Sequence, residues 1–265
     1  MSAELDELKD LTRALRRRVS LSDASDFTDA PLPAWVSPPK PVAGAPAAPK
    51  PAPKAAPAPA PAPVPSKDGT LEALAAKIHA CRACELGSYR IQAVPGVGSP
   101  TAKVMFVGEG PGFQEDHKGE PFIGRSGQLL DKIMESIGLS RATVYIANIV
   151  KCHPMKDPKD PEAHGNDRPP TPEEMAACRG WLEAQIRAIK PKVIVTLGAV
   201  PARALLDDPT PITKLRGQWR EYDPGQGLPP IKLLPTFHPA ALLRNPDLKR
   251  DVWTDMKNLQ KELSK

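Results

Sequence analysis

The sequence predicts an α/β fold of three layers, in which helices cover both faces of a central, mainly parallel four-stranded sheet. Four short apolar runs supply the strands, at residues 103–108, 144–150, 192–198 and 231–239. Amphipathic helical patterns follow the strands in turn, at residues 126–137, 172–189, 200–206 and 247–263. Such alternation of strand and helix is typical of a parallel sheet that is covered on both sides.

Each predicted element has local support. The strand runs are bounded by Gly, Pro or charged residues, as buried strands are. The longest predicted helix has a defined start, because Thr171 is a candidate N-cap and Pro172 suits the first helical position. Glu173 and Glu174 add negative charge to the first turn of this helix, where the helix dipole favours it.

Proline divides the chain into three parts. The 265 residues include 34 prolines, and their excess is concentrated between Pro31 and Pro65, where Pro and Ala fill most positions. This composition predicts a disordered or polyproline-like linker at residues 31–67. The linker separates an N-terminal arm, residues 1–30, from a domain at residues 68–265.

The arm has its own pattern. Leucines recur at helical spacing and are followed by arginines: Leu5, Leu8, Leu11 and Leu15, then Arg16, Arg17 and Arg18. Because a short isolated helix is marginal in water, one interpretation is a poorly ordered tail. The others are a helix that docks onto a protein partner and a segment that contacts a membrane surface.

Hydropathy and charge set the broad class. No run of 18 apolar residues is present, and the N-terminus lacks the basic and apolar regions of a signal peptide. We therefore expect a cytoplasmic protein without a membrane span, and we expect it to be a monomer. The formal charge of +5 is a mild indication of a polyanionic partner.

The loops after the strands predict the place of the functional site. The first strand is followed by "GEGPG", the second ends in residues 148–154, the third is followed by Gly198, and the fourth by His238 and Pro239. Because ligands bind outside the carboxyl ends of parallel strands, these segments should converge on one site.

The loop after the first strand does not match a phosphate-binding motif. It has no GxxxxGK[ST] pattern, and its next predicted helix starts only near Ser126. Pro111 removes an amide donor, and Glu115 and Asp116 add negative charge. The loop is better suited to a neutral or partly charged ligand that the backbone approaches closely.

Four cysteines indicate a metal site. Cys81 and Cys84 form a CxxC pair, whereas Cys152 and Cys178 follow at long spacing. Four thiolates can hold a [4Fe-4S] cluster or a tetrahedral zinc ion. Spacing alone leaves open the cluster, the zinc ion and unligated structural thiols.

Several motifs together resemble one known family. They are "GEGPGFQEDHKGEPFIGRSGQLLD", "YIANIVKCHP", "RPPTPEEMAACRGWLEAQIRAIKPKVIVTLG" and "TFHPAALLRNP". In this order they are similar to the motifs of the family 4 uracil-DNA glycosylases, the iron-sulfur members of the uracil-DNA glycosylase superfamily. The resemblance covers about residues 71–262, with all four cysteines in their motif settings, and leaves out the arm and the linker.

The resemblance implies a base excision repair enzyme. Such an enzyme flips uracil out of DNA and hydrolyses its N-glycosidic bond, which leaves an abasic site. The resemblance also implies a structural [4Fe-4S] cluster on Cys81, Cys84, Cys152 and Cys178. Two other functions stay open: a glycosylase with a broader range that includes hypoxanthine and xanthine, and a non-enzymatic iron-sulfur module that binds DNA or recruits a partner.

The resemblance assigns roles to three pocket residues. The carboxamide of Asn148 can donate to O4 of uracil and accept from N3–H. Phe122 offers an aromatic face for the flipped base. His238 can donate to O2, where negative charge develops as the glycosidic bond breaks.

The roles of the loop residues are less determined. Backbone amides of Glu109 and Gly110 can stabilise the departing base, and Gly110 lets it approach because it has no side chain. Many superfamily members have an Asp at the position of Gly110, so this chain has no obvious general base there. Our hypothesis is that Glu115 excludes the methyl group of thymine and that Glu109 orients the loop or the water, although either carboxylate can instead be structural.

The last motif suggests how DNA is held open. We expect Leu242 and Leu243 to lie in a loop and to form an apolar wedge, while Arg244 contacts phosphate. The alternative is that both leucines begin a helix and face the core. The polar stretch at residues 155–168 is expected either to contact DNA or to be mobile.

Overall fold

A computed structural model describes residues 70–225 and 227–265. These residues form a six-stranded sheet with the strand order β1-β3-β2-β4-β6-β5. The strands are β1 (Val97–Gly98), β2 (Val104–Gly108), β3 (Tyr145–Asn148), β4 (Val193–Leu197), β5 (Arg220–Tyr222) and β6 (Ile231–Thr236). The four central strands are parallel and the two edge strands are antiparallel. The predicted α/β class and the mainly parallel sheet are therefore confirmed.

The predicted number of strands is wrong, because the sheet has six strands and not four. The four predicted strands are the central ones, and β2, β3 and β4 are buried along their whole length. The two additional strands lie at the edges. They span only two and three residues, and β5 is mostly exposed, so neither carries the apolar run by which a buried strand is recognised.

The predicted helices are present with small shifts at their ends. They are α5 (Arg125–Glu135), α6 (Pro172–Ile189), α7 (Ala199–Leu206) and α10 (Lys249–Leu263). Helix α6 begins as expected: the side chain of Thr171 accepts from the amide of Glu174, and the Glu174 carboxylate accepts from the amide of Thr171. This capping box fixes the start of the helix.

Short helices occupy several segments between these elements. They are α2 (Thr70–Ala80), α3 (Leu86–Tyr89), α4 (Phe113–Lys118), α8 (Ile212–Leu215), α9 (Pro239–Arg244) and the 3-10 helix η1 (Pro246–Leu248). Two of them correct the sequence analysis. The loop after β2 contains helix α4, which ends at Gly119 in a left-handed conformation (φ 72°) that glycine adopts without strain. The segment after His238 is helix α9 and not a loop.

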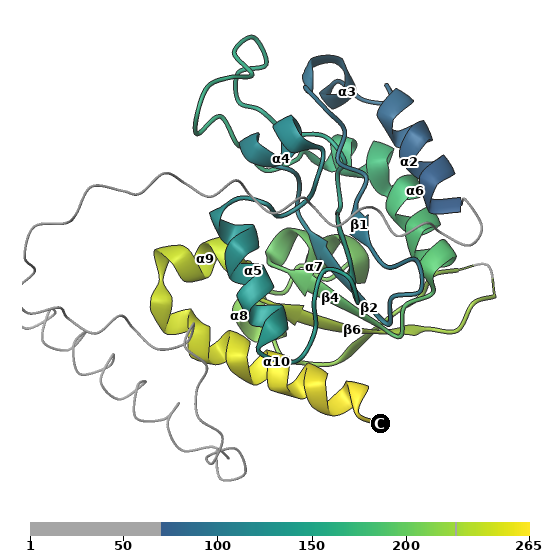
Figure 1. The fold of residues 1–265 in the computed structure, drawn as a ribbon, viewed down its shortest axis with the longest axis vertical. Helices are drawn as coiled ribbons and strands as arrows, with labels where there is room; N and C mark the ends of the chain where they lie inside the picture. Colours follow the sequence, from purple (N-terminus) through teal and green to yellow (C-terminus); the bar gives the residue numbers. More distant parts are fainter. Residues whose placement is uncertain (1–69, 226) are drawn as a thin grey trace, which may run out of the picture. The chain divides into compact units, whose positions relative to one another are not determined.

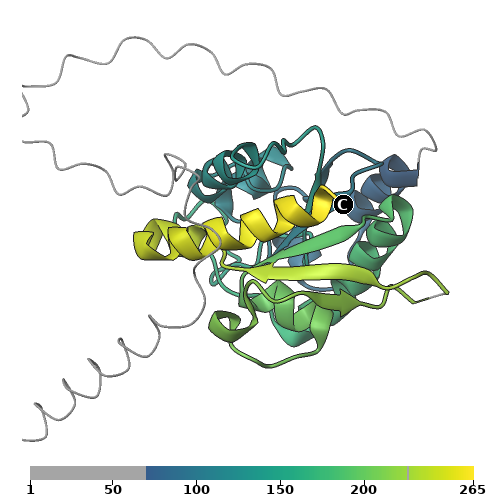
Figure 2. The ribbon, with the colours of Figure 1, turned by 90° about the horizontal axis from the view of Figure 1, so that it is seen from below.

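Helices cover both faces of the sheet. Figures 1 and 2 show α5 and α10 along one face and α6 and α7 along the other, with α2 beside α6. On the α6 side, residues of alternate strand positions such as Met105, Ile194 and Leu233 pack against Leu182 and Ile186. Because the four central strands are parallel, their carboxyl ends all lie at one edge of the sheet.

The N-terminal arm (residues 1–30) and the proline-rich linker (residues 31–67) lie outside the described residues, so their predicted roles stay predictions. The described part begins at Thr70, and the domain start predicted at residue 68 also stays a prediction. None of the helices in the described part is both long enough and apolar enough to cross a lipid bilayer.

Candidate active site

The carboxyl ends of the parallel strands open into one cavity with a volume of about 580 Å³. This volume is within the usual range for small-molecule sites. Most of the predicted site residues line the cavity: Glu109, Gly110, Glu115, Phe122, Asn148, His238 and Arg244. The structure thus brings together side chains from the ends of β2, β3 and β6, as the strand-end rule predicts.

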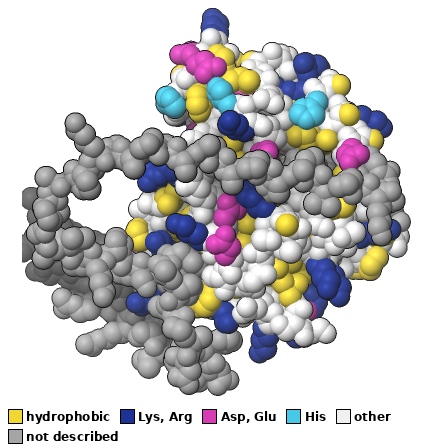
Figure 3. Space-filling model, viewed as in Figure 1, with side chains coloured by type: hydrophobic (Ala, Val, Ile, Leu, Met, Phe, Trp, Pro, Cys, Tyr) yellow, Lys and Arg dark blue, Asp and Glu magenta, His cyan; other side chains and the backbone are white. Residues whose placement is uncertain are grey.

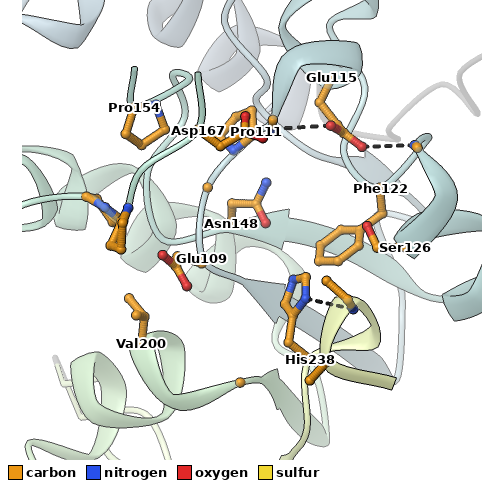
Figure 4. Close-up of a pocket in the computed structure, with 18 of the residues that line it drawn as sticks. Glu109, Pro111, Glu115, Phe122, Ser126, Asn148, Pro154, Asp167, Val200 and His238 are labelled. Atoms are coloured by element: carbon orange, nitrogen blue, oxygen red, sulfur yellow. Dashed lines mark hydrogen bonds between the residues drawn. The ribbon is translucent and has the colours of Figure 1, made fainter. Parts of the chain in front are cut away.

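Asn148 lines the cavity, and its side chain has an unpaired amide oxygen. Asn148 is the last residue of β3 and is 1% exposed. Its Oδ1 atom has no hydrogen-bond partner among the described residues. Figure 4 shows this side chain between Glu109 and Phe122. A buried polar atom is costly when it has no partner, so Oδ1 is poised to accept a hydrogen bond from a ligand.

Gly108 makes room for Asn148, a role that no motif in the sequence marks. The two residues are paired in the β2–β3 register. A Cβ atom on Gly108 would lie 2.4 Å from Asn148 Oδ1 and 2.5 Å from Phe122 Cζ. Gly108 is therefore the position at which any larger residue would displace both pocket side chains.

Phe122 is held in an unusual backbone conformation. Its φ of 55° is left-handed, which is costly for a bulky residue. Arg141 donates to the carbonyl oxygens of Pro121 (3.0 Å) and Phe122, and its Nε donates to Asp131 at 2.7 Å. A Cβ on Gly127 would collide with the Phe122 carbonyl. Arg141 and Gly127 thus fix the aromatic wall. Sequence reasoning missed Arg141 because it lies outside the motif, and it missed Gly127, which lies inside the motif, because its contact with the Phe122 carbonyl depends on the fold.

His238 is neutral and has one defined tautomer. Its Nδ1 atom accepts a hydrogen bond from the amide of Ala240 at 3.1 Å, so the proton is on Nε2. Burial lowers the pKa of His238 to about 4, and the charge of Arg244 acts in the same direction. The imidazole lies 5.6 Å from the ring of Phe122, centroid to centroid. The side chain can therefore offer an N–H donor without a net charge (Figure 4).

Glu115 is bound by the backbone of its own loop. Its Oε2 atom accepts from the amide of Gly112 at 3.2 Å, and its Oε1 atom accepts from the amides of Ile123 and Gly124 at 2.9 and 3.0 Å. Figure 4 shows Glu115, with a hydrogen bond on each of its carboxylate oxygens, on the side of the cavity away from His238. Glu115 therefore joins the start of α4 to the start of α5, which is the structural alternative considered for it above.

Glu109 differs from Glu115. It lines the same cavity, and no hydrogen bond or ion pair engages its carboxylate within the described chain. Burial raises the pKa of Glu109 above its ordinary value. A partly desolvated, unpaired carboxylate in a cavity can accept a proton or hold a water molecule.

Gly110 has a packing role in addition to the one expected. A Cβ atom on Gly110 would lie 2.9 Å from Val150 and 3.4 Å from Pro154. The missing side chain therefore allows the loop after β2 to lie against the segment after β3.

The last two residues of the polar stretch at residues 155–168 form part of the cavity wall. Asp167 and Arg168 line it, and Arg168 forms two hydrogen bonds with the Glu174 carboxylate, at 2.6 and 2.8 Å. Asp167 is bonded to the buried His153 at 2.6 Å, and His153 lies 3.8 Å from Asp116. The end of this polar stretch is thus tied to α6 and α4.

The three residues expected to open DNA are placed differently from one another. Leu242 is 0% exposed, so the expectation that it is free to enter DNA is wrong for this conformation: its side of α9 faces the core. Leu243 is 42% exposed, and Arg244 lines the cavity. Of the two leucines, Leu243 is therefore the one that is exposed to solvent.

All four cysteines line a second, smaller cavity and form no disulfide. Polar groups point at the sulfur atoms: Arg90 Nη1 donates to Cys152 Sγ at 2.8 Å, and the Lys151 amide donates to Cys178 Sγ at 3.3 Å. In the described part of the chain, no three His, Cys, Asp or Glu side chains are arranged to hold a metal ion. The four thiols line one cavity, and one of them accepts from a charged donor, the guanidinium of Arg90.

On the face seen in Figure 3, Lys and Arg side chains of the described residues are spread over the surface and are not gathered in one patch. The cavity between Asn148, Phe122 and His238 is the more specific feature.

Comparisons with known proteins agree with this geometry. The family model described as the uracil DNA glycosylase superfamily matches residues 95–257. A type-4 uracil-DNA glycosylase of Thermotoga maritima is 40% identical over 203 residues, which cover 76% of this chain and 98% of the relative. A type-4 uracil-DNA glycosylase of Archaeoglobus fulgidus is 38% identical over 194 residues, which cover 72% and 92%. The chain belongs to the uracil DNA glycosylase superfamily.

Proposed function

We propose that this protein is a uracil-DNA glycosylase that binds uracil flipped out of DNA and hydrolyses its N-glycosidic bond, leaving an abasic site for base excision repair. The observation that carries the proposal is the unpaired Oδ1 of Asn148, whose side chain lines the same cavity as Phe122 and a neutral His238. The printed names of the relatives give the same activity.

Asn148 supplies the base selectivity in this proposal. Its Oδ1 accepts from N3–H of uracil, and its NH₂ group donates to O4. Cytosine has an acceptor at N3 and a donor at the amino group on C4, which is the opposite pattern. Its N3 would therefore face the acceptor Oδ1, and its amino group would face the NH₂ group of Asn148. A buried site that requires a hydrogen bond rejects a base that cannot form it far more strongly than it rejects a small change of shape.

His238 acts on the leaving base. As the bond between C1′ and N1 breaks, its electron pair moves onto uracil and the sugar gains oxocarbenium character. The oxygen of a water molecule then forms a bond to C1′, and one proton of that water passes to the base or to solvent. The Nε2–H of His238 donates to O2, and this bond is strongest when the charge on O2 is largest.

Glu109 is the stronger candidate for placing the water. Its carboxylate is unpaired, lines the cavity and has a raised pKa, whereas the carboxylate of Glu115 is occupied by three amides. Single-turnover uracil excision by the Glu109→Gln and Glu115→Gln variants tests this role. Unchanged rates in both variants would remove carboxylate chemistry from the mechanism.

The four-cysteine cavity is the proposed site of a structural [4Fe-4S] cluster held by Cys81, Cys84, Cys152 and Cys178. When bound, such a cluster joins the segment before β1, the segment after β3 and helix α6. Broad absorption at about 400 nm, together with iron and sulfide in anaerobically purified protein, tests the assignment. Bound zinc without that absorption would contradict it.

An excision assay tests the activity and its range. Duplexes that contain uracil, hypoxanthine, xanthine or a thymine mismatch are compared, with Asn148→Ala as the control for the pocket. Excision of uracil alone supports the proposal. Excision of the purines as well would favour the broader glycosylase, and binding without any excision would favour a non-enzymatic DNA-binding module.

A further inference from the structure

Lys151 is a buried lysine whose ammonium contacts two neutral oxygens. The side chain is 1% exposed. Its Nζ atom donates to the carbonyl oxygen of Asn148 at 2.8 Å and to Gln185 Oε1 at 2.7 Å. A buried ammonium is expensive to desolvate unless a negative charge is close, and neither of these partners carries one.

The cysteine cavity, which Lys151 also lines, is where a negative charge would compensate this ammonium. Its backbone amide donates to Cys178 Sγ at 3.3 Å, and the next residue in the chain is Cys152. Metal-ligating cysteines are thiolates, and four of them exceed the positive charge of the group they hold, so a loaded site would carry a net charge of about −2 at the cavity that Lys151 lines. Lys151 therefore lies between the cavity of the four thiols and the residue that faces the base.

Gln185, which accepts a hydrogen bond from Lys151, is itself held by two further hydrogen bonds. Its Nε2 atom donates to the carbonyl oxygen of Pro95 at 2.8 Å and to the Tyr145 hydroxyl at 3.2 Å. With its amide nitrogen engaged in this way, Oε1 is directed at Lys151. Lys151 Nζ thus has two acceptors, one of which is itself held by two further hydrogen bonds, and these contacts restrict the position of Nζ.

We propose that Lys151 is a positioning residue that links the thiolate site to base recognition. Its ammonium, held by the charge of the four-thiolate group, fixes the carbonyl of Asn148 and with it the carboxamide that faces uracil. The inference rests on the proposed function. None of the four cysteines lines the base cavity, so none can contact the base directly. Through Lys151, however, the cysteine site would affect how the base is bound.

The main test is the Lys151→Met variant, which keeps the length of the side chain and removes the charge. Protein with a full complement of iron and sulfide is compared with wild type in single-turnover uracil excision. We expect the rate at saturating enzyme to fall at least 10-fold, because small displacements of a positioned group are costly. The half-saturating enzyme concentration on DNA should change less than 3-fold. The affinity for free uracil, measured by calorimetry, should fall with the rate.

A double-mutant cycle separates positioning from general destabilisation. In the Asn148→Ala background the carboxamide is absent, so Lys151→Met should lower the rate by less than 3-fold more. A further loss equal to that seen in the wild-type background would overturn the proposal. A wild-type rate in loaded Lys151→Met protein would also overturn it, while the wild type's own excision of uracil would leave the proposed function standing.

Arg90 provides the matched control. It is the other cation at the cysteine cavity, where it donates to Cys152 Sγ and to backbone carbonyls, and it has no contact with Asn148. Arg90→Met should lower the iron content per chain, and its excision rate per loaded chain should fall much less than that of Lys151→Met. An equal loss per loaded chain in both variants would contradict a specific link through Lys151.

A second variant covers the case in which Lys151→Met does not take up iron. Gln185→Met removes one acceptor of the ammonium and leaves the contacts of the cysteines in place. It should lower excision and uracil affinity in the same direction, and it should have little effect in the Asn148→Ala background. No change in either quantity would overturn the proposal.

Discussion

Gly108 and Asn148 lie opposite each other in the β2–β3 pair, and a Cβ atom on Gly108 would lie 2.4 Å from the Oδ1 atom of Asn148. The same atom would lie 2.5 Å from the ring of Phe122. The carboxamide and the aromatic ring of the pocket therefore share a space that exists only because residue 108 has no side chain. This contact makes the geometry of the pocket sensitive to one methyl group.

We expect Gly108→Ala to lower single-turnover uracil excision by about 100-fold or more, because both base-contacting side chains must move. Helix α6 supplies the control, since a Cβ on Gly180 would meet nothing within 4 Å. Gly180→Ala should keep the wild-type rate and should raise the stability by at most about 1 kcal/mol. A Gly108→Ala enzyme with full activity would show that the pocket adapts to the added methyl group.

The tautomer of His238 predicts a simple pH profile. With its pKa lowered to about 4, the imidazole is neutral across the range from pH 5.5 to 8. The excision rate should therefore show no fall that depends on His238 in this range. His238→Ala should lower the rate by about 100-fold at every pH, the usual effect of removing one donor to a developing anion. A wild-type rate that falls with a midpoint near pH 6.5 and does not fall in the variant would contradict a neutral His238.

The same residue should affect stability with a definite sign. Its pKa is about 6.5 in the unfolded chain and about 4 in the fold. A group whose pKa is lowered by folding contributes its full stability at a pH above the pKa of the unfolded chain. This contribution is lost as the pH falls through the pKa of the folded protein. Urea denaturation at pH 7 and pH 4.5 should therefore show a larger loss of unfolding free energy for the wild type than for His238→Ala. Equal losses would show that His238 is not shifted.

How far the sequence predicts this molecule depends on whether a feature is local. The start of α6 could be placed because Thr171, Pro172 and Glu174 act within one turn. The strand-end rule placed Asn148 and His238 at one edge, because strand order matters little when all carboxyl ends meet there. Strands β1 and β5 were missed because they span only two and three residues and carry no apolar run.

The remaining features depend on long-range contacts. Arg141 clamps the Phe122 segment from 19 residues away in the chain, and no periodicity marks such a contact. The side of α9 that faces the core was also undetermined, since Leu242 and Leu243 are adjacent and equally apolar. Tertiary packing alone separates them, with Leu242 buried and Leu243 exposed.

Glu115 and Glu109 should differ in their effects on stability. Glu115→Gln replaces one of two carboxylate oxygens that accept from three amides, and it leaves the Gly112 amide without its acceptor. We expect a loss of about 1–3 kcal/mol in the free energy of unfolding. Glu109→Gln breaks no hydrogen bond given by the described residues, so its effect should stay within about 0.5 kcal/mol. Urea denaturation measures both, and a larger loss in Glu109→Gln would mean that Glu109 is the structural carboxylate.

The two leucines of α9 should separate stability from DNA opening. Leu242→Ala removes a fully buried side chain and should cost about 2–5 kcal/mol of stability. Leu243→Ala changes an exposed position next to the cavity and should alter stability by less than about 0.5 kcal/mol. Because an apolar wedge fills the space left by a flipped base, Leu243→Ala should slow excision from duplex DNA more than from single strands, where no partner base competes. Equal effects on the two substrates would assign the opening of the duplex to groups other than Leu243.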